Sequence, residues 1–336
     1  MMEKILLTGG IGYIGSHICV ELLNKGYQVF VVDNLSNSSK QVLSQIEVIT
    51  GRNVTFFEND VRDKHNLIKI FKQHSFDSVI HLAGLKSIND SVKNPLDYYN
   101  NNVIGAITLL EVMSMVNCKS IIFSSSASVY GAANIMPISE LCHVSTTNPY
   151  AQTKLVIENL LQDVFTSDSD WSISILRYFN PVGAHQSGLI GESPSGVPNN
   201  LFPYIAKVAN GKLPKLTIFG NDYDTHDGTG IRDYIHVVDL AKAHLKSLEV
   251  IKPDSKVSVL NLGTGKGYSV LDVVRGFEVA SNRTIPYEFV ARRKGDVAQC
   301  YADPSLAFKL LNWKTEFKLS QMCQDAWNWE KFSPPL

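Results

Sequence analysis

The sequence has no long apolar run, no excess of charge of one sign and no closely paired cysteines. No apolar stretch approaches the roughly 18 residues of a membrane-spanning helix, and the N-terminus has neither a basic region nor a small-residue cleavage site. We therefore expect a cytoplasmic protein with no membrane partner. The 31 Lys and Arg residues balance 32 Asp and Glu residues, so no nucleic-acid partner is expected and any bound anion must be held by local groups.

The sequence also offers little to a metal ion. Its five cysteines lie far apart and form no C-x-x-C pair, so we expect free thiols rather than a zinc site or a redox motif. Asp222, Asp224 and Asp227 lie close together, but they lack the spacing and the closing glutamate of a calcium-binding loop. No metal is predicted.

Short apolar runs alternate with helical patterns in the first half of the 336-residue chain. Strands are expected at residues 4–8, 28–33, 54–58, 78–82, 120–124 and 173–178. This alternation predicts an α/β fold with a doubly wound parallel sheet of the Rossmann type. Residues 181–230 are rich in glycine and proline, and helical patterns return after them. We expect a Rossmann domain over residues 1–180 and a smaller, mixed α/β substrate lobe over residues 181–336, partly interleaved with the first.

A glycine-rich tract, TGGIGYIG, lies where the first strand should meet the first helix. Gly9, Gly12 and Gly15 are spaced three residues apart, and such glycines let backbone N–H groups approach a pyrophosphate at the positive end of a helix. A turn without a ligand is the alternative for an isolated tract of this kind. Asp33 closes the second strand, where a carboxylate accepts hydrogen bonds from ribose hydroxyls and repels a 2′-phosphate. The combination predicts NAD rather than NADP.

Further cofactor contacts are expected around this unit. Tyr13 and Ile14 lie inside the glycine tract, and Asn34 follows the carboxylate that ends the second strand. Asp60 and Val61 follow the third strand at the same edge of the sheet, where they could meet the adenine. A role as a helix N-cap is equally compatible with the position of Asp60. A second glycine-rich tract, GTGKG at residues 263–267, lacks the surrounding unit and is interpreted as a loop.

A tyrosine and a lysine are expected on one face of a later helix. Tyr150 and Lys154 are four residues apart just after Pro149, which opens a helix. A neighbouring ammonium favours the phenolate form of a tyrosine, so the two can act as one acid–base unit. Ser126 follows the fifth strand at the edge of the sheet, where its hydroxyl can bind a substrate oxygen. For the tyrosine and lysine alone, packing at the surface is the alternative.

The tracts TGGIGYIGSH, YAQTK and RYFNPVGAH, together with Ser126, resemble the extended short-chain dehydrogenase/reductase superfamily and, within it, the UDP-galactose 4-epimerase family. The resemblance extends from about residue 4 to about residue 330. In related dehydratases an acidic pair follows the serine or threonine of this strand, whereas Ala127 and Ser128 follow it here. A dehydratase is therefore disfavoured.

The resemblance implies an enzyme that interconverts UDP-glucose and UDP-galactose through a 4-keto sugar. Tyr150 would remove the proton of the 4-hydroxyl, with NAD as the transient electron acceptor that stays bound. Two alternatives remain open. One is another NAD-dependent oxidoreductase or dehydratase of nucleotide sugars, and the other is a catalytically silent protein that binds them.

The resemblance also implies binding residues elsewhere in the chain. On the cofactor side they are Lys86, Asn101, Tyr178 and Pro181. On the substrate side they are Asn180, Asn199, Asn200, Leu201, Arg232, Tyr234, Arg293 and Asp296. The guanidinium groups suit a diphosphate, and Asp296 can accept hydrogen bonds from the uridine ribose. The alternatives are a solvated lysine, a helix N-cap for Asn101 and surface ion pairs for the arginines.

Cys300 occupies the position at which some members of the family carry a tyrosine beside the C2 substituent of the sugar. Because cysteine is much smaller, rejection of a 2-acetamido group should be weakened. UDP-N-acetylglucosamine and UDP-N-acetylgalactosamine are therefore expected as further substrates. A buried small apolar residue is the alternative interpretation. The resemblance finally implies a homodimer, built on helices around residues 100–117 and 150–166.

Overall fold

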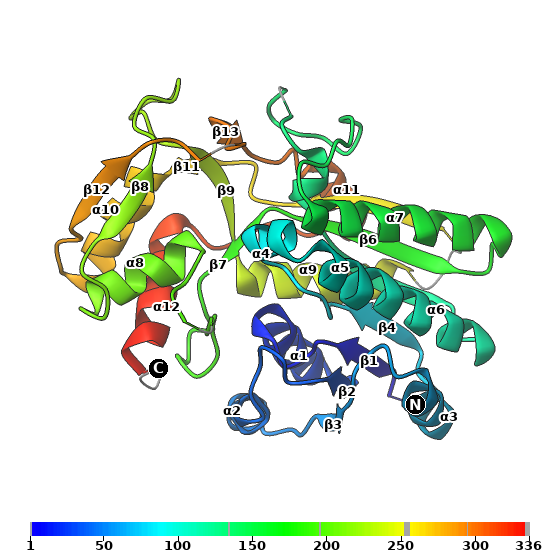
Figure 1. Cartoon of the computed structure of the whole chain (residues 1–336). Helices are drawn as coiled ribbons and strands as arrows, with labels where there is room; N and C mark the ends of the chain where they lie inside the picture. Colours follow the sequence, from blue (N-terminus) through cyan, green and yellow to red (C-terminus); the bar gives the residue numbers. More distant parts are fainter. Residues whose placement is uncertain (1, 134, 195, 252–255, 294, 333–336) are drawn as a thin grey trace.

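A parallel sheet of seven strands forms the centre of the structure (Figure 1). The structure is a computed structural model that describes residues 2–133, 135–194, 196–251, 256–293 and 295–332. In spatial order the strands are β10 (Val257–Leu262), β6 (Ser172–Tyr178), β5 (Ser120–Ser126), β4 (Ser78–His81), β1 (Lys4–Thr8), β2 (Gln28–Asp33) and β3 (Thr55–Glu58). The predicted doubly wound Rossmann fold is confirmed, because every pairing in this sheet is parallel.

Helices cover both faces of the sheet, as the near-continuous apolar strands require. One face packs against α1 (Tyr13–Lys25), α2 (Gln41–Thr50), α9 (Val237–Ile251) and α11 (Ser305–Leu311). The other face packs against α3 (Lys64–His74), α6 (Gly105–Met115) and α7 (Pro149–Ser167). Shorter segments beside α6 and α7 are α4 (Ile88–Lys93), α5 (Pro95–Tyr98), the π-helical η1 (Tyr99–Ile104) and the 3-10 turn η2 (Ala127–Tyr130). Two apolar cores result, one on each side of the sheet.

The edge strand β10 is supplied by a late part of the chain. It follows the loop-rich region in the sequence, yet it pairs with β6 in parallel register, with Leu260 opposite Leu176. The helix α9 likewise lies after that region and packs on α1 against the same face of the sheet. Both α9 and β10 are therefore part of the central layer, although the sequence places them in the second half.

The remaining elements form a smaller body at the carboxyl edge of the sheet, at the left of Figure 1. Its strands are β7 (Asn180–Val182), β8 (Leu216–Phe219), β9 (Ile231–His236), β11 (Gly267–Ser269), β12 (Tyr287–Val290) and β13 (Gln299–Cys300). Its helices are α8 (Leu201–Ala209), α10 (Val270–Ser281) and α12 (Leu319–Phe332). Phe202, Phe277 and Trp327 belong to a third apolar core between these helices. None of the helices in the described ranges is both long and apolar enough to cross a bilayer.

Candidate active site

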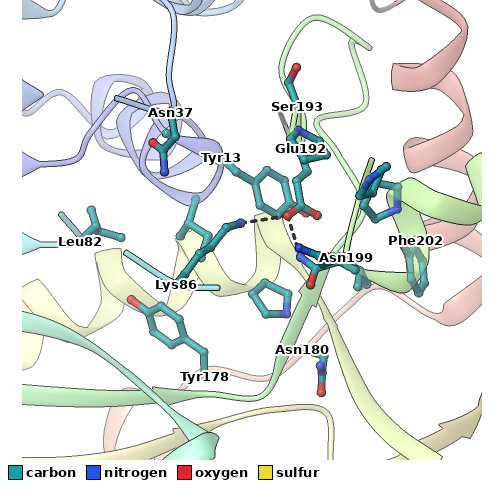
Figure 2. A pocket seen from close by; sticks show the side chains of 18 of the residues that line it. Tyr13, Asn37, Leu82, Lys86, Tyr178, Asn180, Glu192, Ser193, Asn199 and Phe202 are labelled. Carbon is teal, nitrogen blue, oxygen red and sulfur yellow. Dashed lines mark hydrogen bonds and ion pairs between the residues drawn. The ribbon is translucent and has the colours of Figure 1, made fainter. Parts of the chain in front are cut away.

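A cavity of about 1100 Å³ lies between the carboxyl edge of the sheet and the smaller body. Every predicted site residue lines it except Asp60 and Cys300. Figure 2 shows side chains that enter it from both sides, among them Tyr13 and Lys86 from the sheet and Asn199 from the smaller body. The topology thus brings residues that are far apart in the sequence into one space.

The glycine tract forms a turn in which main chain packs on main chain. Gly9 has a positive φ of 70°, and a Cβ there would lie 2.8 Å from the backbone nitrogen of Ala83. A Cβ on Gly15 would lie 2.5 Å from the carbonyl oxygen of Gly9. No side chain caps α1 at Gly12, and the first turn of the helix holds no acidic residue. The positive end of α1 is therefore left for an anion, which fits the pyrophosphate of NAD.

Asp33 is fixed at the floor of the cavity. Its side chain accepts hydrogen bonds from the backbone nitrogen of Leu35 at 3.0 Å and from the hydroxyl of Ser38 at 2.8 Å. The residue is only 8% exposed, so its carboxylate holds one orientation beside the glycine turn. That placement fits an acceptor for the adenosine ribose of NAD.

Asp60 supports this wall from outside the cavity, and the N-cap interpretation is wrong. The N-cap of α3 is Asp63, whose side chain accepts a hydrogen bond from the backbone nitrogen of Asn66 at 3.1 Å. Asp60 instead forms an ion pair with Arg62 at 2.8 Å and accepts from the amide of Asn34 at 2.9 Å. Hydrogen bonds from the Arg62 guanidinium hold the pKa of this carboxyl well below its usual range. Asp60 thereby orients Asn34, which does line the cavity.

The helix α7 begins where the sequence predicts and carries the tyrosine and lysine into the cavity. Asn148 caps it, because its side chain accepts a hydrogen bond from the backbone nitrogen of Ala151 at 2.9 Å. Lys154 is 5% exposed, and its ammonium donates to the carbonyl oxygen of Ser124 at 2.6 Å. Burial lowers the pKa of Lys154 to about 8, although the nearby Glu158 carboxylate acts in the opposite direction. The ammonium lies 6.0 Å from the centre of the Tyr150 ring.

Ser126 completes the group at the end of β5. Burial raises the pKa of Tyr150, while a hydrogen bond with Ser126 lowers it. The Ser126 hydroxyl also accepts from the hydroxyl of Ser128 at 2.9 Å. Both serine hydroxyls are therefore oriented within one hydrogen-bonded cluster at the edge of the sheet, next to the tyrosine.

Glu192 is a lining residue that sequence reasoning missed. It accepts hydrogen bonds from the ammonium of Lys86 at 2.9 Å and from the amide of Asn200 at 2.8 Å. The Glu192 side chain is 11% exposed and lies between the two halves of the cavity (Figure 2). Lys86 is thus an ion-pair partner across the cleft, not only a solvated lysine. No motif surrounds Glu192 in the sequence, and only the fold brings it to this place.

Asn101 also lies in the cavity wall rather than at a helix start. It is inside the π-helical segment η1, so the N-cap alternative for this residue is wrong. Asn200 does occupy the N-cap position of α8, but its side chain makes no capping hydrogen bond there. Its amide is turned toward Glu192 instead.

The two arginines of the substrate half are held by different contacts. Arg232 donates to the carbonyl oxygen of Val297 at 2.9 Å and lies 3.9 Å from the carboxylate of Asp296. The guanidinium of Arg293 stacks on the ring of Phe219 at 3.8 Å. Tyr223 is a further lining residue that the sequence did not reveal, and its buried hydroxyl has no hydrogen-bond partner among the described residues. An orphaned hydroxyl in a cavity wall fits a polar ligand.

Cys300 is not among the residues that line the cavity, but it lies on β13, next to the strand that carries Arg232. It pairs with Arg232 in parallel register and packs in an apolar cluster that includes Tyr130 and Phe179. The five cysteines are all free thiols, as the sequence predicts. Burial raises the pKa of the Cys300 thiol, so the side chain acts as a small apolar group.

Comparisons with known proteins agree with this geometry. The family model of GDP-mannose 4,6 dehydratase matches residues 6–326. The chain is 55% identical over 331 residues to the UDP-glucose 4-epimerase of Haemophilus influenzae, with 98% of each chain covered. It is similar to the crystal structure of UDP-glucose 4-epimerase from Bifidobacterium longum in complex with NAD+ and UDP, with a TM-score of 0.94, 51% identity and 98% of each chain covered. The UDP-Glc/GlcNAc 4-epimerase of Campylobacter jejuni is similar with a TM-score of 0.87 and 36% identity over 98% of this chain and 99% of that one.

Proposed function

The chain belongs to the UDP-glucose 4-epimerase family of the extended short-chain dehydrogenase/reductases, and on that premise we propose how its cleft works. The enzyme interconverts UDP-glucose and UDP-galactose, with NAD as its cofactor. One observation carries this assignment to the cleft. A single cavity holds the glycine turn, the group formed by Ser126, Tyr150 and Lys154, and the arginines of the substrate half.

We propose that the two nucleotides occupy opposite halves of this cavity. NAD is held by Gly9, Gly12, Tyr13, Ile14, Gly15, Asp33, Asn34, Val61, Lys86, Asn101 and Tyr178. The UDP-sugar is held by Asn180, Asn199, Asn200, Leu201, Arg232, Tyr234, Arg293 and Asp296. Bound NAD would supply a reversible electron acceptor for C4 of the sugar, so that no net oxidation would result.

Tyr150 is the proposed base and acid of the reaction. It takes the proton of the 4-hydroxyl as the carbonyl forms, and it returns a proton when the carbonyl is reduced. A tyrosine has a pKa of about 10 in water, and burial makes the phenolate of Tyr150 still less favourable. The hydrogen bond with Ser126 opposes that effect of burial, and we propose that the ammonium of Lys154, 6.0 Å from the ring centre, stabilises the phenolate as it forms. Ser126 also lies close enough to Tyr150 to bind the same sugar oxygen.

An assay of the purified protein with UDP-galactose and no added NAD tests this function. We expect UDP-glucose to form, because the cofactor is retained between turnovers. In Tyr150→Phe the turnover should fall by about 10³-fold, since positioned acid–base catalysis contributes roughly 10² to 10⁴. The NAD content of that variant should remain that of the wild type. Full activity of Tyr150→Phe would overturn the proposed mechanism.

We further propose that the enzyme accepts the N-acetylated UDP-hexoses. Cys300 supports this because it lies beside Arg232, a lining residue, on the neighbouring strand and is much smaller than tyrosine. A small residue there leaves room for the wall to move away from a 2-acetamido group. The C. jejuni relative, a UDP-Glc/GlcNAc 4-epimerase, supports the same extension.

Cys300→Tyr is the variant that tests the N-acetyl substrates. We expect kcat/KM for UDP-N-acetylglucosamine to fall by at least 10-fold, while kcat/KM for UDP-galactose changes by less than about 3-fold, because only the bulkier sugar meets the new ring. Cys142→Tyr, in the same apolar cluster, is the matched control. Absence of UDP-N-acetylglucosamine turnover in an otherwise active wild type would contradict the proposal.

A homodimer in the cytoplasm is the proposed state of the enzyme. Its support is an exposed apolar stripe on α4, α5 and η1, where Val92, Leu96 and Ile104 are 62%, 81% and 47% exposed. These elements lie beside α6 and α7, the helices on which a dimer is expected. Light scattering of the purified protein, compared with Leu96→Glu, tests the assignment. A monomeric wild type would contradict it.

A further inference from the structure

A buried histidine stands behind the cavity wall, next to a tyrosine on the cofactor side. Tyr178 ends β6, is 5% exposed and lines the cavity (Figure 2). Its hydroxyl is hydrogen-bonded to Nε2 of His244, a residue of α9 that is completely buried and does not line the cavity. The two rings meet edge to face, with centroids 5.4 Å apart.

The other ring nitrogen of His244 fixes the direction of this hydrogen bond. Nδ1 lies 2.8 Å from the carbonyl oxygen of Leu240, one turn earlier in α9. A carbonyl oxygen only accepts, so Nδ1 must carry a proton. Burial lowers the pKa of His244 to about 4, so the imidazole is neutral and Nε2 is an acceptor. The Tyr178 hydroxyl therefore donates its only proton to His244.

We propose that His244 is a positioning residue that acts through Tyr178. By accepting the hydrogen bond from the Tyr178 hydroxyl on the inner side, it leaves the Tyr178 oxygen only the role of acceptor. One acceptor position meets the side chain of Ser124, and the other is left for the cofactor end of the cavity. An acceptor in this position fits a primary amide that donates N–H, which is the group that the nicotinamide end of NAD carries. The proposal rests on the proposed function, since Tyr178 is assigned there to the cofactor.

The arrangement also separates the roles of the two tyrosines in the cavity. The Tyr178 hydroxyl donates its hydrogen bond to a neutral imidazole, and burial raises the pKa of Tyr178, although a hydrogen bond with Ser124 acts in the opposite direction. Tyr150 has a hydrogen bond with Ser126 and the ammonium of Lys154 in its surroundings. The difference is that the Tyr178 hydroxyl already donates to His244, so Tyr150 is the better placed of the two to exchange a proton with the substrate, while Tyr178 serves as an acceptor.

Two variants at position 244 test the proposal in the holoenzyme. In His244→Leu the acceptor is lost, the Tyr178 hydroxyl becomes free to rotate, and we expect kcat to fall by about 10-fold with KM for UDP-galactose nearly unchanged. The NAD retained after gel filtration should also fall. In His244→Gln the side-chain amide oxygen can accept the hydrogen bond from the Tyr178 hydroxyl again, so kcat and NAD retention should both recover to within about 3-fold of the wild type.

A double-mutant cycle separates positioning from a general packing role. In a Tyr178→Phe background there is no hydroxyl to donate a hydrogen bond to position 244. His244→Leu should therefore cause no further loss of kcat or of retained NAD. Ser247→Ala is the matched control on the same helix, because it removes a buried hydrogen bond to Ser174 of β6 at 2.8 Å without touching Tyr178. It should leave NAD retention unchanged.

Two results would overturn the inference. One is an equal effect of His244→Leu with and without the Tyr178 hydroxyl, and the other is a His244→Gln variant as impaired as His244→Leu. Urea unfolding of each variant shows whether the fold is intact. NAD retention is measured without turnover, so the inference can fail while the wild type epimerises, and an inactive wild type would instead contradict the proposed function.

Discussion

In the cofactor half of the cleft the glycine turn is a wall of closely packed main chain, whereas the polar wall of the substrate half is made of side chains from separate segments. The turn between β1 and α1 packs so closely that a Cβ on Gly15 would lie 2.5 Å from a carbonyl oxygen. In the substrate half, Arg232, Arg293 and Asn200 come from separate segments and are held by other side chains or carbonyl groups. The glycine turn therefore has no room for an added side chain, whereas the substrate half depends on many separate side-chain contacts.

The difference explains which part of the site tolerates change. A main-chain site fails when any side chain intrudes, because the backbone has no room to move. A side-chain site fails residue by residue, and each loss is limited to the contacts of that residue. We therefore expect large, shared effects in the cofactor half and smaller, separable effects in the substrate half.

Among variants of Lys154, Gly15 and Arg293, substitution of Lys154 should change turnover the most, and it should change stability in the opposite direction. Its lowered pKa of about 8 corresponds to about 3 kcal/mol against the buried charge near neutral pH, since one pKa unit is about 1.4 kcal/mol. Lys154→Met also loses a hydrogen bond to Ser124, which costs about 1 kcal/mol. The variant should therefore be more stable by about 2 kcal/mol at pH 7 in urea unfolding without NAD, while turnover falls by at least 10²-fold.

The pH dependence of the wild type provides the control for Lys154. The folded protein binds this proton less tightly than the unfolded chain does, so the stability of the wild type should rise as pH increases from about 8 to about 10.5. This rise in stability with pH should be absent in Lys154→Met, which has no group to titrate at this position. If Lys154→Met were less stable than the wild type at pH 7, the claim that burial of the Lys154 charge destabilises the fold would be wrong.

Gly15→Ala tests the main-chain wall directly. The new Cβ meets the carbonyl oxygen of Gly9, so we expect a loss of about 1 to 3 kcal/mol in the free energy of unfolding, together with loss of retained NAD. Gly12→Ala is the control, because its Cβ would find no atom closer than 3.4 Å. Its stability should stay within about 0.5 kcal/mol of the wild type. Equal destabilisation of both variants would break the comparison.

Arg293→Gln should show the smallest and most confined effect. It removes the stacked guanidinium beside Phe219, and we expect KM for UDP-galactose to rise by about 10-fold because a charged contact to the diphosphate is lost. NAD retention should not change. Arg292→Gln is the adjacent control, since Arg292 pairs with Asp222 at the surface and does not line the cavity. A loss of NAD in Arg293→Gln would show that the two halves are not separable.

The same contrast explains what the sequence reveals. The glycine turn, Asp33 and the pair Tyr150 and Lys154 each depend on neighbouring residues, so local patterns predict them and the structure places them in the cavity. The strand at 257–260 is also recognisable, but its partner β6 is distant in the sequence. Local periodicity carries no information on which sheet a strand joins.

Residues that depend on tertiary contacts escape prediction. Glu192 has no motif around it, and its role arises only when the fold brings Lys86 and Asn200 to its carboxylate. Asp60 occupies a position that suits an N-cap, yet Asp63 takes that role and Asp60 pairs with Arg62. For Glu192 the sequence offers no local signal at all, whereas for Asp60 two local arrangements are equally good and packing decides between them.

The late strand β10 has a consequence for how the chain is made. β6 ends at Tyr178 and β10 ends at Leu262, so the ribosome must add some 84 further residues before the sheet can close. At roughly 5 to 20 residues per second, that takes about 4 to 17 s. During this interval β6 is an unpaired edge strand of the nascent chain, and it exposes side chains that are buried in the folded protein. An edge of that kind pairs readily with other chains, so newly synthesised protein should depend on chaperones most during synthesis of residues 179–262.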